Sequence, residues 1–480
     1  MERLSGLDAA FLALETPSMH MHVSAVLVLE PPEEARHEPT AVQVERIRQV
    51  IAERLHLVPL LRRRAVRVPF GVHHPLWADD PDFDLDYHVQ RASLPAPGGP
   101  AELASVVAAL VGRPLDTGRP LWEMHLIEGL DSGHVAVVPK VHHAAIDGVS
   151  GAEILAAFLD LGPEGRHVAP PETAWQPEAL PTDAEVLGYS LSSLTRQPDK
   201  VVGALKRTFG ALVDLSERNR RLREEQESSP PPAPFRAPRT SLNGAISPHR
   251  RTAFAEVAME DVRSVRSAFG GTVNDVVLAA VSGALRRLLD ERGERPEEAM
   301  VALVPMSVRT EADRGAHGNK LSAMLVSLAS TVGDPVERLR TVAEGTRLAK
   351  EQAQVLSEDL IGGWAQLAFP ALSSRLARMS GNLRVFDHLP PLFNVVVSNV
   401  VGPEFPLWWA GSKVVALYPL GPILEGVGLN VTVISYTGTL YIGVVGCRQL
   451  VPEVAHFGHL VSEAVAELVK AAVRHGGHWA

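Results

Sequence analysis

The spacing of apolar and polar residues predicts that strands and helices alternate in both halves of this chain. Short runs rich in Val, Ile and Leu are typical of strands inside a sheet, whereas apolar residues three and four positions apart are typical of helices. The predicted strands are residues 23–30, 134–141, 252–257, 301–304 and 393–397. The predicted helices are residues 44–57, 101–110, 260–269 and 274–292. Strands and helices in both halves predict an α/β (α+β) fold.

Residues 426–447 form an uncharged stretch that has to be tested as a membrane span. About 20 apolar residues suffice for a transmembrane helix. This stretch, however, contains the polar residues Asn430, Thr432 and Ser435, and its residues 436–439 form a turn between two β-branched runs. We therefore expect a β-hairpin here. The first eight residues are charged and lack the apolar core of a signal peptide, so we expect neither a signal peptide nor a membrane-spanning segment.

A Pro-rich segment divides the chain nearly in half. Residues 217–251 are charged and then rich in proline, with three consecutive prolines at 230–232. Such a run neither continues a helix nor enters the interior of a sheet, so it predicts an extended, solvated linker. The predicted organisation is an N-terminal lobe at 1–216, a crossover linker at 217–251 and a C-terminal lobe at 252–480.

Composition narrows the classes of protein that remain. The 480 residues are 46% hydrophobic and 21% charged, which excludes disorder as the main state. The formal net charge of -10 argues against nucleic-acid binding, for which a basic face is expected. Cys447 is the single cysteine, so no disulfide forms within the chain, and a reducing compartment is favoured.

The candidate chemistry lies in residues 141–151, where His142 and His143 end a predicted strand and Asp147 and Gly148 follow. A zinc site would need further ligands near these residues, and a serine hydrolase would need a Gly-x-Ser-x-Gly elbow, which is missing here. The histidines could also be hydrogen-bonded loop residues without a catalytic role. A general base is the remaining reading, because a neutral imidazole is available at physiological pH. Pro139 interrupts the strand before His142 and predicts an edge or bulged strand.

The pattern His-His-x-x-x-Asp-Gly resembles the signature of the CoA-dependent acyltransferase superfamily, which includes chloramphenicol acetyltransferase and peptide-synthetase condensation domains. Further motifs resemble the bacterial wax ester synthase/diacylglycerol acyltransferase family. They are LSGLDAAF at 4–11, MHMH at 19–22, RPLWE at 119–123, TVNDVVL at 272–278, VPMSVR at 304–309 and NVVVSNVVGP at 394–403. Their order, from residue 4 to about 450, covers both predicted lobes. One departure is Val401, where the family usually has proline, so we expect a less rigid turn after Asn399.

The resemblance implies two chloramphenicol-acetyltransferase-like lobes with the active site at their interface. It also implies transfer of a fatty acyl group from acyl-CoA, as co-substrate and without cofactor or metal, to diacylglycerol or a long-chain alcohol. His143 would be the general base, His142 would support it, and Asp147 would be structural and pair with an arginine, for which Arg309 is the candidate. No covalent acyl-enzyme is required.

The resemblance also implies roles for other motif residues. Asn274, Ser398 and Asn399 are candidates for binding substrate or the oxyanion, although Asn274 could instead cap the helix that follows and the other two could be turn residues. The structural motif residues are Pro120, Leu121, Trp122, Asp275 and Arg309, of which 120–122 are expected to pack rather than to contact substrate.

Apolar substrates imply a lipid surface, and one segment could provide the contact. Residues 360–379 carry large apolar side chains with Arg375 and Arg378 at one end, as in an amphipathic helix that lies on a membrane. A core-facing helix broken at Pro370 would have the same pattern, and both readings stay open. We expect a cytoplasmic protein with peripheral contact to the inner membrane or a lipid inclusion. The alternative functions are a same-fold transferase that uses carrier-protein-bound acyl chains or a polyketide alcohol, and a noncatalytic lipid-droplet-binding protein.

Overall fold

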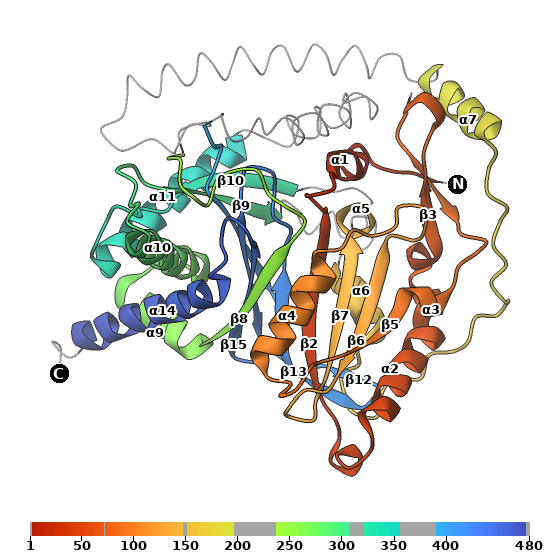
Figure 1. Ribbon diagram of the computed structural model, residues 1–480, viewed down its shortest axis with the longest axis horizontal. Coiled ribbons are helices and arrows are strands. Elements are labelled where there is room, and N and C mark those ends of the chain that lie inside the picture. The colour runs from red at the N-terminus through yellow and green to blue at the C-terminus, as the bar shows by residue number, and fades with distance from the viewer. Residues whose placement is uncertain are drawn as a thin grey trace.

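The computed structural model describes residues 2–71, 73–146, 151–195, 237–307, 321–355 and 390–476. Within these residues the chain forms two lobes, each built on a mixed six-stranded sheet with helices packed against it. Figure 1 shows the lobes side by side, with most of the first half in red and orange and most of the second half in green and blue. The predicted α/β fold with two sheet-containing lobes is confirmed.

The sheet of the first lobe is centred on strands β2 and β7. In spatial order its strands are β12 (Trp408–Trp409), β13 (Ser412–Leu420), β2 (His22–Glu30), β7 (Val135–His142), β6 (Trp122–Glu128) and β5 (Val89–Ser93). Strands β5 and β6 run parallel, and the other neighbouring pairs run antiparallel. The strands predicted at 23–30 and 134–141 are confirmed as β2 and β7.

Side chains alternate between the two faces of this sheet, and different helices cover each face. Leu27 belongs to the core beneath α2 (Thr40–Arg54) and α6 (Gly151–Phe158). Its neighbour Val26 belongs to the core beneath α4 (Pro100–Val111) on the opposite face. Because α4 also contacts β8 (Arg250–Ala258) of the second lobe, this second face is directed toward the lobe junction.

The remaining elements of the first lobe surround this sheet. They are helices α1 (Gly6–Leu14), α3 (Leu85–His88), α5 (His143–Ile146) and α7 (Asp183–Thr195), the 3-10 helices η1 (Glu33–Ala35), η2 (Leu55–Leu57), η3 (Pro59–Arg62) and η4 (Pro69–Gly71), and a small sheet of β1 (Glu2–Arg3), β4 (Leu76–Asp79) and β3 (Arg63–Val66). The helix predicted at 44–57 is α2 followed by η2, and the helix predicted at 101–110 is α4.

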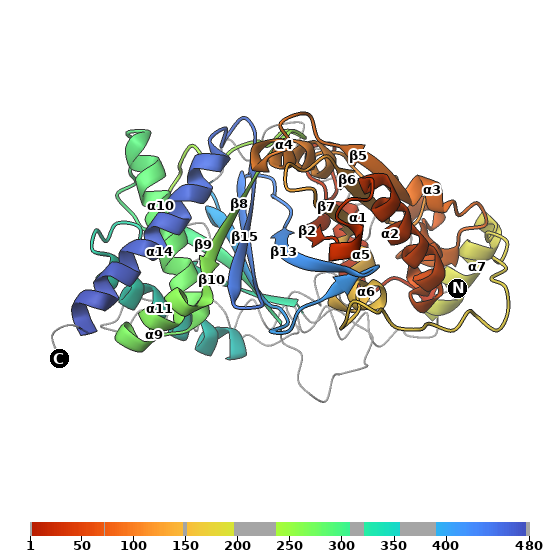
Figure 2. The ribbon, with the colours of Figure 1, turned by 90° about the horizontal axis from the view of Figure 1, so that it is seen from below.

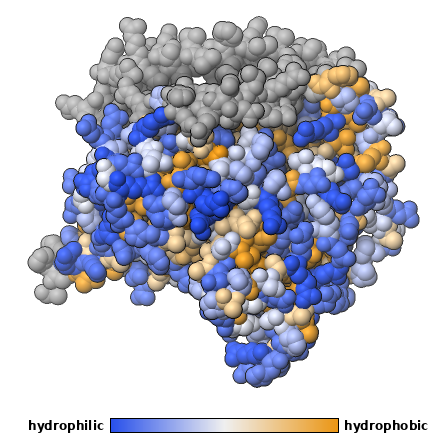
Figure 3. All heavy atoms as spheres, viewed as in Figure 1, coloured by the Kyte–Doolittle hydropathy of each residue, from blue (hydrophilic) through white to orange (hydrophobic). Residues whose placement is uncertain are grey.

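The second lobe has a sheet with helices on its outer face (Figure 2). The strands in spatial order are β10 (Leu321–Ser327), β9 (Val301–Ser307), β11 (Val395–Val401), β14 (Leu429–Tyr436), β15 (Thr439–Cys447) and β8 (Arg250–Ala258). The helices are α9 (Met259–Phe269), α10 (Val273–Glu291), α11 (Pro335–Val355) and α14 (Val454–Gly476). Figure 3 shows that the surface over these helices is mostly polar, as expected for helices whose apolar side faces a sheet. The strands and helices predicted in this half are confirmed as β8, β9, β11, α9 and α10.

The predicted hairpin at 426–447 is confirmed as β14 and β15, which pair antiparallel. Their connection consists of Thr437 and Gly438, both with positive φ, at 43° and 84°. Positive φ at both positions is typical of the type I′ turns that suit the twist of paired strands.

The second half of the chain also contributes two strands to the first lobe, which the division at residues 217–251 did not anticipate. Strands β12 and β13 belong to the second half of the sequence, yet β13 pairs with β2 in the sheet of the first lobe. The two sheets approach each other closely where β13 ends. A Cβ atom on Gly443 of β15 would lie 1.8 Å from the carbonyl oxygen of Pro419, so this approach requires glycine.

The expectation that Pro139 marks an edge or bulged strand is wrong. β7 lies between β2 and β6. Its register with β2 is the same on both sides of the proline, since Ser24 pairs with Lys140 and Leu27 pairs with Val137. The pairs opposite Pro139 are missing from this ladder, so the strand tolerates the lost N–H through a local gap rather than a bulge.

The expectation of a solvated linker at 217–251 is wrong for residues 237–251, of which Arg250 and Arg251 begin β8, while 217–236 lie outside the described residues. Leu242 is fully buried in the core of the second lobe, and Ile246 is buried at the lobe junction. The side-chain amide of Asn243 donates to the carbonyls of Phe393 and Gly426. These apolar and amide side chains attach the segment to the second lobe. Composition alone does not show that they behave differently from the prolines before them.

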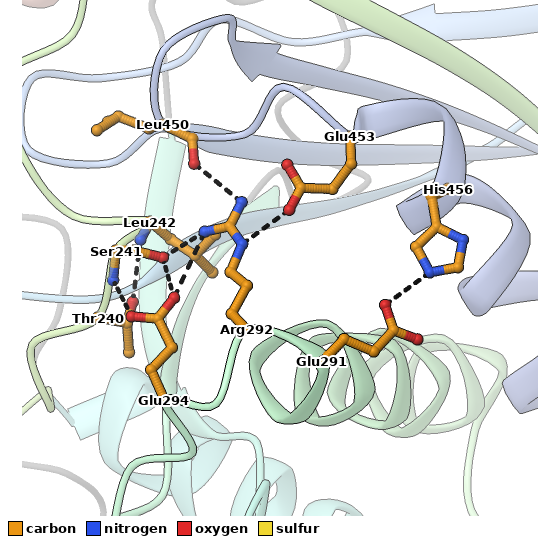
Figure 4. Close-up of polar contacts among 9 residues, drawn as sticks. All are labelled: Thr240, Ser241, Leu242, Glu291, Arg292, Glu294, Leu450, Glu453 and His456. Carbon is orange, nitrogen blue, oxygen red and sulfur yellow. Dashed lines mark hydrogen bonds and ion pairs between the residues drawn. The ribbon is translucent and has the colours of Figure 1, made fainter.

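A polar network around Arg292 attaches the same segment to two other parts of the second lobe (Figure 4). Arg292, the residue after α10, donates to the carboxylate of Glu453 at 2.8 Å and to the carbonyl of Leu450 at 3.0 Å. It also contacts the hydroxyl of Ser241. Nearby, His456 of α14 lies 2.7 Å from Glu291. The network joins the end of α10 to the start of α14 and to residue 241.

No single helix in the described parts of the chain has both the length and the apolar composition needed to cross a membrane. Helices α9 and α10 meet these requirements only when taken together, and their axes are bent by 98° at the break between them.

Candidate active site at the end of strand β7

His142 and His143 lie at the junction where β7 ends and α5 begins. Their backbone amides are held from opposite sides. The N–H of His142 donates to the carbonyl of Leu121 at 2.9 Å, and the N–H of His143 donates to the carbonyl of Met21 at 2.7 Å. All residues of β7 are buried. The rigid strand and the two backbone bonds therefore fix both histidines.

The His142 side chain has one tautomer available to it in this geometry. The backbone N–H of Ala144 donates to its Nδ1 at 3.0 Å, so Nδ1 carries a lone pair and the ring proton is on Nε2. Nε2 lies 3.3 Å from Oε1 of Glu15, an electrostatic contact that is not aligned as a hydrogen bond. With its ring fully buried and held between Ala144 and Glu15, His142 is placed to support the junction.

Glu15 is ionised although it is largely buried. Burial raises the pKa of Glu15, but the contact with His142 and the hydrogen bond from the Met21 N–H outweigh burial, and the net effect lowers this pKa. The Met21 N–H donates to Glu15 at 3.1 Å. One carboxylate thus connects Met21, the residue before β2, to the ring of His142.

His143 is a neutral imidazole in an apolar setting. Its ring packs against Phe11 with 4.2 Å between ring centroids. Burial, with a smaller contribution from His142, lowers the pKa of His143 to about 4. Its Nδ1 is buried and has no hydrogen-bond partner among the described residues. At neutral pH the ring is uncharged and can accept a proton, which is the state that a general base requires.

Helix α1 positions Phe11 over this ring. The helix begins with a capping box in which Ser5 Oγ accepts from the Asp8 N–H at 3.2 Å and the Asp8 carboxylate accepts from the Ser5 N–H at 3.3 Å. Such a cap contributes about 1 kcal/mol to the start of a helix. The motif LSGLDAAF therefore folds into a fixed cover for His143.

Comparison with known proteins identifies the family. Residues 4–277 match the model of the wax ester synthase/diacylglycerol acyltransferase catalytic domain, and residues 317–469 match the WS/DGAT C-terminal domain. The chain belongs to the wax ester synthase/diacylglycerol acyltransferase family. It is therefore an acyltransferase, with the two histidines inside the catalytic-domain match.

Relatives and solved structures agree with this family. A Mycobacterium tuberculosis protein named "putative diacyglycerol O-acyltransferase" is 36% identical over 471 residues, which cover 98% of this chain and 90% of the relative. A second relative of the same name from that species is 37% identical over 438 residues and covers 91% and 90%. The structure of the wax ester synthase/diacylglycerol acyltransferase from Marinobacter aquaeolei VT8 is 28% identical, with a TM-score of 0.69, and covers 98% of this chain and 100% of that chain.

The acyltransferase shares its fold with a wider group. The first condensation domain of the calcium-dependent antibiotic synthetase has a TM-score of 0.52 at 18% identity and covers 98% of this chain and 95% of that chain. At this identity the likeness concerns the fold alone, and it agrees with the predicted two-lobe architecture.

Part of the predicted site lies outside the described residues of the acyltransferase. Asp147, Gly148 and Arg309 are among these, so the pairing of Asp147 with Arg309 stays a prediction. Residues 360–379, the candidate lipid contact, lie outside as well. Among the residues that are described, no group of three or more His, Cys, Asp or Glu side chains is placed to hold a metal ion.

The alternative reading of Asn274 as a helix cap is wrong, because Thr272 caps α10. Thr272 Oγ1 accepts from the N–H of Asp275, and the Asp275 carboxylate accepts from the N–H of Thr272 at 2.8 Å. Asn274 is half-buried in the first turn, and its side chain forms no hydrogen bond within the described part of the chain. Asp275 therefore has a local structural role, while a role for Asn274 toward substrate stays a prediction.

The reading of Ser398 and Asn399 as turn residues is also wrong. Both lie inside β11, where they pair with Thr432 and Val433 of β14. The strand continues to Val401, whose side chain is 89% exposed, so the expected turn directly after Asn399 does not occur. Ser398 and Asn399 are half-buried, and the assignment of either to an oxyanion stays a prediction.

The segment Pro120-Leu121-Trp122 is built into the first lobe. Leu121 and Trp122 are buried, and the Trp122 indole N–H donates to the carbonyl of Leu61 at 2.7 Å. His88 stacks on the Trp122 ring with 4.6 Å between centroids. Because the carbonyl of Leu121 also accepts from the N–H of His142, the segment supports one side of the histidine junction.

Sequence reasoning missed the charged groups beneath the histidine junction. Lys140, two residues before His142 on the same face of β7, is 1% exposed. Its Nζ lies 2.8 Å from Glu123 and donates to the carbonyls of Leu110 and Arg113 near the end of α4. Burial opposes ionisation of Glu123, but His125 and Lys140 lower its pKa to about 2. A sequence pattern could have revealed these groups. Charged residues that occupy every second position of an otherwise apolar strand predict a buried polar face.

Proposed function

We propose that this acyltransferase moves a fatty acyl group from acyl-CoA to diacylglycerol or to a long-chain alcohol, with His143 as the general base. The observation that carries the proposal is the neutral His143 ring, which is fixed at a strand-to-helix junction and covered by Phe11. The relatives named as diacylglycerol O-acyltransferases support the acceptor, and the Marinobacter protein supports a wax ester product.

The chemistry requires one proton to move and return. An imidazole nitrogen of His143 takes the proton of the acceptor hydroxyl as the oxygen attacks the carbonyl carbon of the thioester. The tetrahedral intermediate then expels the CoA thiolate, which takes the proton back from His143. General-base catalysis of this kind contributes roughly 10²–10⁴-fold in rate. The intermediate needs a donor for its oxyanion, and Asn274, Ser398 and Asn399 stay our candidates.

Direct transfer without an acyl-enzyme suits the surroundings of the single cysteine. Cys447 is fully buried in the core at the lobe junction. Its sulfur lies 3.5 Å from the backbone N of Ser247 and 3.5 Å from the side chain of Gln449. A packed, hydrogen-bonded thiol of this kind is a poor nucleophile, so we assign Cys447 no part in the reaction.

The test is a direct comparison of donors and acceptors with the full-length protein. Palmitoyl-CoA would be offered with diolein or with hexadecanol while release of free thiol and formation of ester are followed. A parallel reaction would offer a palmitoyl-loaded carrier protein with the same alcohols. We expect thiol release and ester formation in equal amounts with palmitoyl-CoA and at least one alcohol.

Each other outcome names a different function. Ester formation from the carrier protein alone would contradict the CoA donor and favour a carrier-dependent transferase. Binding of diolein without ester from either donor would favour a noncatalytic lipid-binding protein.

We also propose that the protein meets its apolar substrates at a membrane or lipid-inclusion surface. The proposal rests on the chemistry of the acceptors. Flotation with vesicles that contain diolein tests it: we expect the protein to rise with the vesicles, and recovery of all protein in the bottom fraction would contradict it.

A further inference from the structure

A small polar cavity lies at the junction of the two lobes, behind the histidine motif. Its first-lobe wall includes His20, His22 and Ser24, and its second-lobe wall includes Arg250 of β8 and Val445 of β15. Residues 420–423, which lead from β13 toward β14, complete it. His22 is also the direct strand partner of His142 across β2 and β7.

Several polar atoms on this wall have no hydrogen-bond partner among the described residues. They are Nδ1 of His22, the hydroxyl of Ser24 and both ring nitrogens of His20, one of which lies near the carbonyl of Gly112 without the alignment of a hydrogen bond. The three side chains are 3%, 5% and 9% exposed. A buried polar atom without a partner costs about 1–3 kcal/mol, so four of them around one cavity call for an occupant.

The tautomer of His22 defines what the occupant must supply. Burial lowers the pKa of His22 well below its usual value, so the ring is neutral. Its Nε2 lies 2.9 Å from the carbonyl of Val111, an acceptor, and therefore carries the ring proton. Nδ1 is then a lone pair that needs a donor. Ser24 can donate or accept, and the neutral ring of His20 offers one donor and one acceptor.

The dimensions of the cavity limit the occupant. Its volume is about 10 Å³, which is the space for a single water molecule and too little for a phosphate or a carboxylate. A second cavity of the same volume lies in the core of the second lobe, and apolar residues such as Val276, Ala280 and Val431 line it. Apolar cavities of this kind stay empty, so this second cavity serves as an internal comparison for the occupancy of the polar cavity.

We propose that the polar cavity is a binding site for one ordered water molecule, which hydrogen bonds to His20, His22 and Ser24 and fills the junction between the lobes. A buried water typically makes about three hydrogen bonds, which matches the three side chains. The water donates to Nδ1 of His22 and so keeps the ring proton on Nε2, directed at the end of α4. The water thereby helps to hold the paired strands β2 and β7 at the position of His142.

A small anion is the competing occupant, because Arg250 is close. The guanidinium is already engaged, since it donates to the carbonyls of Ser18 and Ser247. A neutral His22 with an acceptor nitrogen at the cavity also disfavours an anion, because two acceptors would face each other. These contacts favour water over chloride.

A high-resolution crystal structure of the full-length protein, grown with sodium bromide in place of chloride, tests the occupant directly. We expect one water within hydrogen-bond distance of His22 Nδ1 and Ser24 Oγ, and no density in the apolar cavity near Ala280. An anomalous bromide peak in the polar cavity, or an empty polar cavity, would overturn the proposal.

A matched pair of variants tests the energetic part. Ser24→Thr and Ser24→Val have side chains of the same shape, and only threonine keeps the hydroxyl. We expect Ser24→Val to melt about 1–3 °C below Ser24→Thr because the water loses a partner. Equal melting temperatures for the two variants would contradict a role of the hydroxyl in holding the water.

Discussion

Replacing Lys140 by methionine tests whether the charged groups beneath α4 hold β7 in place. The Lys140 side chain is almost fully buried and bonds to Glu123 and to two carbonyls near the end of α4. Methionine fills similar volume without the charge or the donors. The carboxylate of Glu123 would then stay buried without its main partner.

The expected cost follows from the geometry of this pair. Removing one partner of a buried ion pair costs about 3–5 kcal/mol. The Glu123 side chain is only 12% exposed, but His125 stays 3.3 Å from it and partly compensates. We therefore expect a loss near the lower limit, about 3 kcal/mol in the free energy of unfolding. The double variant Lys140→Met/Glu123→Leu removes the stranded charge and should recover at least ~1 kcal/mol of this loss.

Urea unfolding followed by tryptophan fluorescence measures both effects. Lys413→Met, the same substitution at an exposed position, serves as the control and should unfold as the unmodified protein does. A Lys140→Met variant whose free energy of unfolding lies within ~1 kcal/mol of the control would refute the reasoning, because breaking a buried ion pair destabilises a protein by more than this. A double variant less stable than the single variant would refute it equally.

Three further predictions concern the base, its cover and the second lobe. The pKa of His143 is lowered to about 4, so the base is neutral above that pH. A plot of kcat/KM against pH should therefore be flat from pH 8 to about 5 and fall only below pH 5, and a midpoint near pH 6.5 would contradict this prediction. Phe11→Ala exposes the His143 ring and should raise its pKa, which moves the acid limb of the profile to higher pH. Phe11→Leu keeps an apolar cover and should shift the limb less, and identical profiles for the two variants would count against burial as the cause of the lowered pKa. Arg292→Ala removes the bonds to Glu453 and Leu450 and should lower the free energy of unfolding by about 1–2 kcal/mol, measured by urea titration, with no change expected for Arg263→Ala on the exposed side of α9.

Local pattern was sufficient for elements whose signals lie within a few residues. The strands β2, β7 and β8 and the helices α4, α9 and α10 follow from spacing alone because each buries one face or one run. The hairpin at 429–447 follows from a two-residue turn. These features depend on neighbouring residues only.

Features that depend on distant residues could not be predicted in the same way. The position of β7 at the centre of its sheet, despite Pro139, depends on pairing with β2 and β6. The crossing of β13 into the first lobe depends on contacts between residues nearly four hundred positions apart, such as Lys413 and Glu30. The spacing of apolar residues within one segment does not indicate which strands pair with each other.

The candidate site shows the same division. His142 and His143 were found because their motif is continuous in sequence. Glu15 was missed because its link to His142 spans over a hundred residues and no local spacing relates them. Thr272, rather than Asn274, caps α10, although Thr272-x-x-Asp275 is a capping-box pattern that could have been recognised.

The central claim is that His143 removes the proton of the acceptor, and its replacement by glutamine tests this most directly. Glutamine keeps the size and polarity of the side chain but cannot act as a base at neutral pH. His37→Gln, at an exposed position, is the matched control. With palmitoyl-CoA and the preferred alcohol, we predict that kcat falls by roughly 10²–10⁴-fold in His143→Gln only, with an unchanged circular dichroism spectrum. A His143→Gln variant that keeps the kcat of the control would contradict the account.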